Sequence, residues 1–152
     1  MHIVANLPRD RTQTGTLEVW HDGALVASYL CYAKADNAEA ARRGNPERDP
    51  LKPFGDTPCG KWKATVGNAQ ENIATYGPEP VIMLWPLDGQ AYASHQPQNR
   101  RVGIWIHGGA LNEAGGLRPT YGCIRVHNET MAALHTHIRQ VGDIEYVETR
   151  EV

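Results

Sequence analysis

His107 and Cys123 are the residues whose types and positions best suit catalysis. A strand ending at His107 and Gly108 would deliver an imidazole to a sheet edge, and Gly122 would permit a tight turn that exposes the Cys123 sulfur. A thiol becomes a strong nucleophile once its proton is removed, and a neighbouring imidazole both takes that proton and stabilises the thiolate as an ion pair. The two segments therefore predict a cysteine–histidine dyad.

Two further groups are expected around this dyad. Backbone N–H groups at Gly122 and Cys123 could converge on a developing oxyanion, an arrangement worth on the order of 3 kcal/mol per donor. The second ring nitrogen of His107 also needs a partner. Because no Asp or Asn is obviously placed for this, we expect a backbone carbonyl near Gly108 or Gly109 to hold it.

The order of these residues resembles the signature of L,D-transpeptidase (YkuD-like) catalytic domains. In that family an HG pair precedes an [S/T]-H-G-C-[hydrophobic]-R segment, and here HG at 107–108 precedes TYGCIR at 120–125. Residues 56–65 resemble the family's TPxGxFxI strand, and residues 16–32 resemble its opening strands. The resemblance covers nearly the whole chain. It implies a β-sandwich catalytic fold, a thioacyl-enzyme on Cys123, and transfer of a peptidoglycan stem-peptide acyl group to an amine or to water.

The resemblance also implies roles for individual residues. Cys123 is expected to be the nucleophile and His107 the general base, with Gly122 shaping the turn and Arg125 organising the site. Substrate contacts are expected from Tyr121, Thr120, His95, Gly108, Trp105 and Asn128. His95 lies in the polar stretch 94–100, which we place in a loop beside the cleft, although an ordinary surface histidine fits that position as well.

This chain departs from the family pattern at three points. Tyr121 stands where the family usually has His, Cys59 stands where Thr is common, and the linker between His107 and Cys123 is short. Tyr121 offers a hydroxyl and an aromatic wall, but it cannot act as a second titrating imidazole near neutral pH. We expect the replacement of His by Tyr121 to affect the choice of acyl acceptor most.

Other chemistries fit the residues less well. His107, Cys123 and His127 could be imagined as zinc ligands with His95 nearby, but the cysteines match no CxxC zinc pattern, and no metal or cofactor is expected. Papain-like and NlpC-type peptidases usually place Cys before His, opposite to the order here. Sortases share the order His, Cys, Arg and are the runner-up enzyme class. A domain that only binds peptidoglycan or a partner protein through residues 33–56 is the alternative outside enzymology.

Around these residues the sequence predicts a single domain over residues 1–152. The fold class is expected to be mainly β, since Gly and Pro are abundant and alternating apolar runs recur. The resemblance implies that this is a YkuD-like β-sandwich with one or two short helices. A hairpin is expected at 16–20 and 25–32, and further strands at 61–66, 81–85, 102–106 and 143–148. One helix, capped by Asn128, should end at Gly142. Residues 33–56 are irregular apart from a short helix at 37–43, and Cys31 is expected in the core.

Charge and termini limit the partners and the location. A net charge of −2 without basic runs argues against nucleic acid, and no stretch is long enough to enter a membrane. Residues 1–8 lack the features of a secretory signal, so the export route is open, while the implied substrate lies in the periplasm or cell envelope. We therefore expect a peptidoglycan-modifying L,D-transpeptidase that cross-links stems or exchanges D-amino acids. An L,D-carboxypeptidase-type effector toxin with a cognate immunity protein is the alternative.

Overall fold

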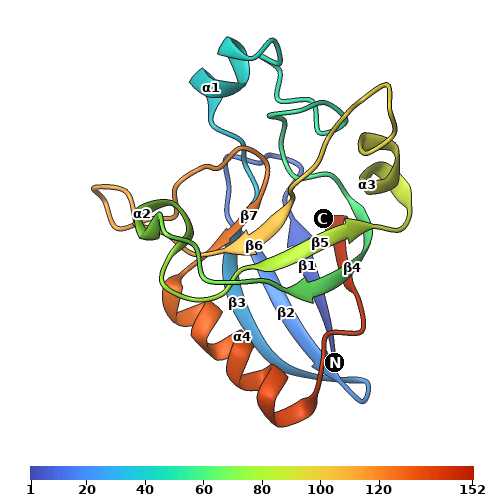
Figure 1. Ribbon diagram of the computed structural model, residues 1–152, viewed down its shortest axis with the longest axis vertical. Coiled ribbons are helices and arrows are strands. Elements are labelled where there is room, and N and C mark those ends of the chain that lie inside the picture. The colour runs from blue at the N-terminus through green and yellow to red at the C-terminus, as the bar shows by residue number, and fades with distance from the viewer.

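The computed structural model describes residues 1–152, and its strands form one closed barrel (Figure 1). The strands are β1 (His2–Leu7), β2 (Gly15–His21), β3 (Ala24–Tyr32), β4 (Gly60–Val66), β5 (Ile82–Pro86), β6 (Trp105–His107), β7 (Ile124–Val126) and β8 (Val147–Glu151). Their order around the barrel is β1-β2-β3-β7-β6-β5-β4-β8, and β8 returns to pair with β1. Closure removes the free edges of the sheet. The β-sandwich prediction is therefore wrong, although the mainly β class is right.

Closure depends on a pairing that no local pattern reveals. β1 forms in residues 1–8, where we predict no strand, and β8 lies further along the chain than the predicted strand at 143–148. The two strands run parallel, with Ile3 opposite Val147, so the first and last strands of the chain close the barrel. A sequence window contains only one member of such a pair, and this is why the sandwich and the barrel could not be distinguished.

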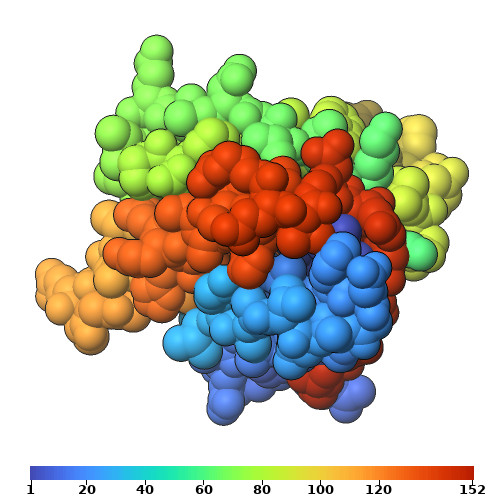
Figure 2. Space-filling model, turned by 90° about the horizontal axis from the view of Figure 1, so that it is seen from below, coloured from blue at the N-terminus to red at the C-terminus, as the bar shows by residue number.

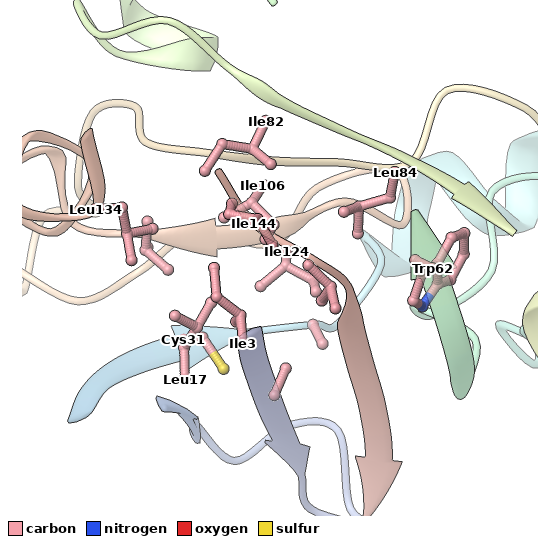
Figure 3. Close-up of a cluster of buried hydrophobic side chains, with 14 of the residues drawn as sticks. Ile3, Leu17, Cys31, Trp62, Ile82, Leu84, Ile106, Ile124, Leu134 and Ile144 are labelled. Atoms are coloured by element: carbon pink, nitrogen blue, oxygen red, sulfur yellow. The ribbon is translucent and has the colours of Figure 1, made fainter. Parts of the chain in front are cut away.

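The core fills the barrel interior. Alternate residues of β1 and β2, such as Ile3 and Leu17, are fully buried, as expected when one face of each strand packs inward. Cys31 is part of this cluster, which confirms its prediction as a core residue (Figure 3). The indole of the buried Trp62 donates to the Thr149 hydroxyl at 3.0 Å, so its polar group remains satisfied inside the barrel.

Several predicted strands are confirmed, with changes in length. The β2–β3 hairpin turns at Asp22 and Gly23, both with positive φ (48° and 76°), as a two-residue Asp-Gly loop requires. β4 and β5 form where alternating or continuous apolar residues predict them. β6 keeps only the end of the predicted 102–106 strand and extends to His107.

Four helices lie outside the barrel, more than the one or two predicted: α1 (Asn37–Arg42), α2 (Ile73–Tyr76), α3 (Gly89–Ser94) and α4 (Asn128–Val141). α4 packs beside β3 through Met131 and Leu134, which recur on one face (Figures 1 and 2). Gly142, with φ of 117°, ends it. The predicted cap is wrong, because His127 occupies the N-cap position and Asn128 is the first helical residue. None of these helices combines the length and apolar character needed to cross a membrane.

Residues 33–56, referred to below as the 33–56 segment, lie above the ends of β6 and β7 in Figure 1. The short helix expected at 37–43 is confirmed as α1, where Asp36 caps the Glu39 N–H at 2.8 Å. In the later part the Asn45 side chain donates to the Asp49 carbonyl and accepts from the Asp49 N–H, and Arg48 forms an ion pair with Asp56 at 3.1 Å. The segment is thus an ordered wall attached to the barrel.

Candidate active site

The parallel strands β6 and β7 bring the predicted dyad together. They pair in the register Ile106 to Ile124 and His107 to Arg125. Because side chains alternate along a strand, Ile106 and Ile124 enter the core while His107 and Arg125 point to the opposite face. Cys123 immediately precedes β7 and reaches the same side, where it lines one cavity with His107.

This cavity has a volume of about 530 Å³ and a mostly polar lining. Asp36 and Glu39, at the start of α1, supply acidic groups, whereas Arg118 and Arg125 supply basic ones. Glu39 is paired with Arg42 and Arg43, so its charge is partly neutralised. The cavity therefore offers groups for both an ammonium and a carboxylate beside the thiol.

The Cys123 thiol is half-buried and held by the backbone of the strand before His107. Its Sγ accepts from the Trp105 N–H and donates to the Gly103 carbonyl, both at 3.4 Å. Burial raises the pKa of the Cys123 thiol, against the Trp105 hydrogen bond and the charges of Arg101 and Arg125, which lower it. The Cys123 thiol is consequently neutral at rest.

His107 is buried, with its ring fixed on one side. Its Nδ1 lies 2.8 Å from the Gly108 carbonyl oxygen, the type of partner expected from the sequence, and its Nε2 has no protein partner. The Tyr76 ring packs edge-on at 4.9 Å between centroids. Burial lowers the pKa of His107 to about 4, although the Gly108 bond opposes this. At rest the site thus holds a neutral thiol and a neutral imidazole rather than the expected ion pair.

The turn before Cys123 is shaped by two threonine hydroxyls. The Gly122 N–H donates to Thr120 Oγ1 at 3.0 Å, so it is not free for an oxyanion, contrary to expectation. Thr120 Oγ1 in turn donates to the Cys123 carbonyl at 2.8 Å, and Thr57 Oγ1 donates to the Gly122 carbonyl at 2.7 Å. Both carbonyls are therefore hydrogen-bonded within the protein. The Cys123 N–H, which makes no hydrogen bond within the protein, is left as the candidate oxyanion donor.

Arg125 also lines the cavity, and its guanidinium donates to three backbone carbonyls. Its Nε donates to the Arg118 carbonyl and its Nη1 donates to the Thr75 carbonyl, both at 2.9 Å, and Nη1 also donates to the Gly108 carbonyl. The Gly108 carbonyl that orients His107 is therefore itself held by a guanidinium. Burial lowers the pKa of Arg125 to about 10, which still leaves it cationic at neutral pH.

The residues expected to contact substrate fall into three groups. Thr120 and Tyr121 line the cavity, and the Tyr121 side chain is 60% exposed at its rim against Phe54. Trp105, Gly108 and Asn128 do not line the cavity. Asn128 Oδ1 accepts from the Gly109 N–H at 2.9 Å. A Cβ on Gly108 would collide with this same oxygen, so the glycine is needed for close approach.

His95 lies apart from this arrangement. It stands at the end of α3, where its Nδ1 is 3.0 Å from the Ala91 carbonyl, and its ring packs edge-on against Trp62 at 5.7 Å. It does not line the cavity. No cluster of three His, Cys, Asp or Glu side chains is arranged to hold a metal ion, so the imagined set with His127 is not assembled.

Sequence reasoning missed Tyr76, Arg101 and Arg118. Tyr76 ends the short helix α2 between the His107 and Trp105 rings, and nothing in its neighbourhood signals chemistry. Arg118 donates to the Ala74 and Ala110 carbonyls and so joins α2 to the connection between β6 and β7, whose exposed part projects to the side in Figures 1 and 2. The missed residues all depend on long-range contacts.

One solved structure shares the fold, and two others are similar in part. Bd1075 of Bdellovibrio bacteriovorus is 11% identical, with a TM-score of 0.56 over 97% of this chain and 46% of that one. An L,D-transpeptidase of Mycobacterium smegmatis (12% identity, TM-score 0.42) and one of Xylanimonas cellulosilytica (16%, 0.43) match 98% of this chain and 58% and 60% of theirs. The chain thus spans about half the length of these proteins. No curated protein sequence matches it.

Family comparison covers almost the whole chain. The family model of the YkuD L,D-transpeptidase catalytic domain matches residues 1–147. This range contains β1 to β7, the first residue of β8, and both His107 and Cys123. The chain therefore belongs to the YkuD family of L,D-transpeptidase catalytic domains.

Proposed function

We propose that this domain is a peptidoglycan-modifying cysteine L,D-transpeptidase that forms a thioacyl-enzyme on Cys123. The observation that carries the proposal is that Cys123 and His107 line one cavity while the second ring nitrogen of His107 is held by the Gly108 carbonyl. This leaves Nε2 as the ring nitrogen able to accept a proton. The donor would be a tetrapeptide stem, attacked at the carbonyl preceding its terminal D-amino acid.

The neutral resting pair suggests the order of events. Cys123 Sγ bonds to the substrate carbonyl carbon as His107 Nε2 takes the thiol proton, and the carbonyl oxygen, now an anion, is met by the Cys123 N–H. Collapse breaks the amide bond, and the leaving amine takes the proton from His107. An acceptor amine or water then attacks the thioester as His107 again takes a proton. The C–S bond breaks, and His107 returns the proton to the Cys123 sulfur, which restores the neutral pair.

The charges of the cavity support this class of substrate. A stem peptide presents both ammonium and carboxylate groups near the reacting carbonyl. Asp36 and Glu39 suit the former, and Arg118 and Arg125 suit the latter. On this proposal the domain acts in the periplasm or cell envelope, where such stems are found.

Mass spectrometry of stem-peptide products tests the proposal directly. Wild type should release the terminal D-amino acid, Cys123→Ala should not, and Cys59→Ala should match wild type because that thiol lies beside Arg11 and outside the cavity. Products also identify the acceptor: water gives a tripeptide, an added D-amino acid gives an exchanged tetrapeptide, and a diaminopimelate amine gives a dimer. Equal activity in Cys123→Ala would contradict the proposal.

A further inference from the structure

Arg101 is a buried cation near the nucleophile that neither the family motif nor the steps above employ. Its residue is only 2% exposed. Its guanidinium donates to four carbonyl oxygens, those of Pro50 (2.6 Å), Gly55 (2.8 Å), Asp56 (2.8 Å) and Tyr121 (3.5 Å). The first three belong to the 33–56 segment and the last to the turn before Cys123. One side chain thus ties the wall of the cavity to the turn that carries the thiol.

The positive charge of Arg101 has no carboxylate partner. The nearby Asp56 side chain is paired with Arg48 at 3.1 Å and accepts from the Ala35 N–H at 2.8 Å. Burial lowers the pKa of Arg101 to about 10, so the group is still protonated at neutral pH. The charges of Asp56 and Asp49 oppose this lowering of the pKa without forming an ion pair with Arg101. A buried charge whose hydrogen bonds all go to neutral carbonyls costs stability, and four carbonyls could be satisfied without one. This cost would be offset if an anion formed beside the guanidinium during the reaction.

The anion that can form there is the Cys123 thiolate. Gly122 has φ of 120°, and a Cβ on it would collide with Nη2 of Arg101, so the guanidinium packs directly on the residue preceding the nucleophile. Among the groups around the thiol, the charge of Arg101 lowers the pKa of Cys123, as does that of Arg125. His107, being neutral at rest, contributes no cation until it has taken the proton.

We propose that Arg101 is a positioning residue that holds the Cys123 turn against the 33–56 segment and stabilises the thiolate as it forms. The inference rests on the proposed function of Cys123 as nucleophile. Arg101 keeps its protons throughout, since the thiol proton goes to His107 and the sulfur electron pair goes to the substrate carbon. A guanidinium suits this task because its planar fork donates to several fixed carbonyls while its charge stays in place.

Alkylation of Cys123 by iodoacetamide across pH 6–10 measures thiolate formation without any peptidoglycan substrate. The other titratable or charged groups that line the same cavity are unchanged between the variants compared: His107, Tyr76, Tyr121, Arg118, Arg125, Asp36 and Glu39. In Arg101→Met we expect alkylation at pH 8 to slow by roughly tenfold. Arg101→Lys keeps the charge but loses the planar set of donors, so we expect a smaller slowing, of about threefold.

Two controls separate charge from structure. Cys59, a half-buried thiol beside Arg11, is followed in the same peptide digest and should keep its rate in every variant. Arg48→Met removes the ion pair to Asp56 and so weakens the same 33–56 segment without removing the charge near Cys123. Its Cys123 profile should match wild type even if its melting temperature falls.

An unchanged Cys123 profile in Arg101→Met would overturn the proposal, as would equal slowing in Arg48→Met. If Arg101→Met fails to fold, Arg101→Lys still tests the proposal. Slowing of Cys123 alkylation by tenfold or more in Arg101→Lys, where the charge is retained, would show that the charge does not stabilise the thiolate. Failure of the proposed function is a separate result, since it would appear as full stem-peptide activity in Cys123→Ala whatever the alkylation profiles.

Discussion

On the barrel side of β6 and β7, Ile106 and Ile124 are fully buried among aliphatic side chains, whereas on the other side His107 and Cys123 face an open cavity. The inner pair gains stability from burial, at about 2 kcal/mol for each side chain. The outer pair is held through backbone groups, such as the Gly108 carbonyl, and burial disfavours its charged forms. Within this strand pair, the inner face therefore contributes stability, and the outer face carries the side chains proposed to react.

The largest effect is expected from a substitution on the outer face, that of His107 and Cys123, which leaves the inner face intact. His107→Asn can still donate to the Gly108 carbonyl but has no group to accept the thiol proton. We expect stem-peptide turnover to fall by a factor of about 10²–10⁴. The free energy of unfolding should change by only about 1–2 kcal/mol at pH 7. Turnover assays and urea denaturation measure the two quantities.

The matched control is His95→Asn, because the Nδ1 of His95 also meets a backbone carbonyl, that of Ala91, but outside the cavity. It should retain turnover within about twofold of wild type if His95 has no part in the reaction. Loss of activity in His95→Asn equal to that in His107→Asn would erase the distinction between the two positions.

Ile124→Ala breaks the inner face. Removing a fully buried isoleucine leaves a cavity in the barrel, so we expect a loss of about 2–5 kcal/mol in unfolding free energy, against about 1 kcal/mol for Ile124→Val. The folded fraction of Ile124→Val should still turn over substrate at close to the wild-type rate. A large loss of turnover in a stable Ile124→Val protein would mean that the faces are not independent.

The buried His107 imidazole also predicts how stability depends on pH. Its pKa is about 4 in the folded protein against 6.5 ordinarily, so between these values the unfolded chain binds a proton that the folded chain does not. Its contribution is complete above pH 6.5 and declines as the pH falls toward 4, by on the order of 3 kcal/mol at most. Urea denaturation at pH 7, 6 and 5 should show a smaller decline in His107→Asn than in wild type. Identical declines would contradict the burial argument.

Much of the outer face could be predicted from the sequence because its residues lie close together in the chain. His107, Gly122, Cys123 and Arg125 fall within two short segments whose glycines mark tight backbone. The carbonyl partner of His107 is its own neighbour, Gly108. Local spacing is enough for such features.

What could not be predicted depends on chain segments that are distant in sequence. Tyr76 contacts His107 from α2, and Arg101 contacts both the turn before Cys123 and the 33–56 segment. β1 pairs with β8 from the opposite end of the chain. The Gly122 N–H was expected to serve the oxyanion, but Thr120 two residues earlier accepts it. A motif specifies which residues are present, whereas competition among their hydrogen bonds appears only in the folded protein.

The smallest expected effect concerns Tyr121, which replaces the family's usual histidine at the exposed rim. Tyr121→His would place a second titrating imidazole beside the cavity without disturbing the core, so unfolding free energy should change by less than about 0.5 kcal/mol. We expect formation of the thioacyl-enzyme to change by no more than about threefold, because His107 and Cys123 are untouched. The ratio of hydrolysis to amine transfer should shift, since an imidazole can deprotonate an acceptor near neutral pH and a tyrosine cannot. Product ratios from pH 6 to 8, with Tyr121→Phe as control, measure this; the same ratios in all three proteins would place acceptor choice elsewhere in the cavity.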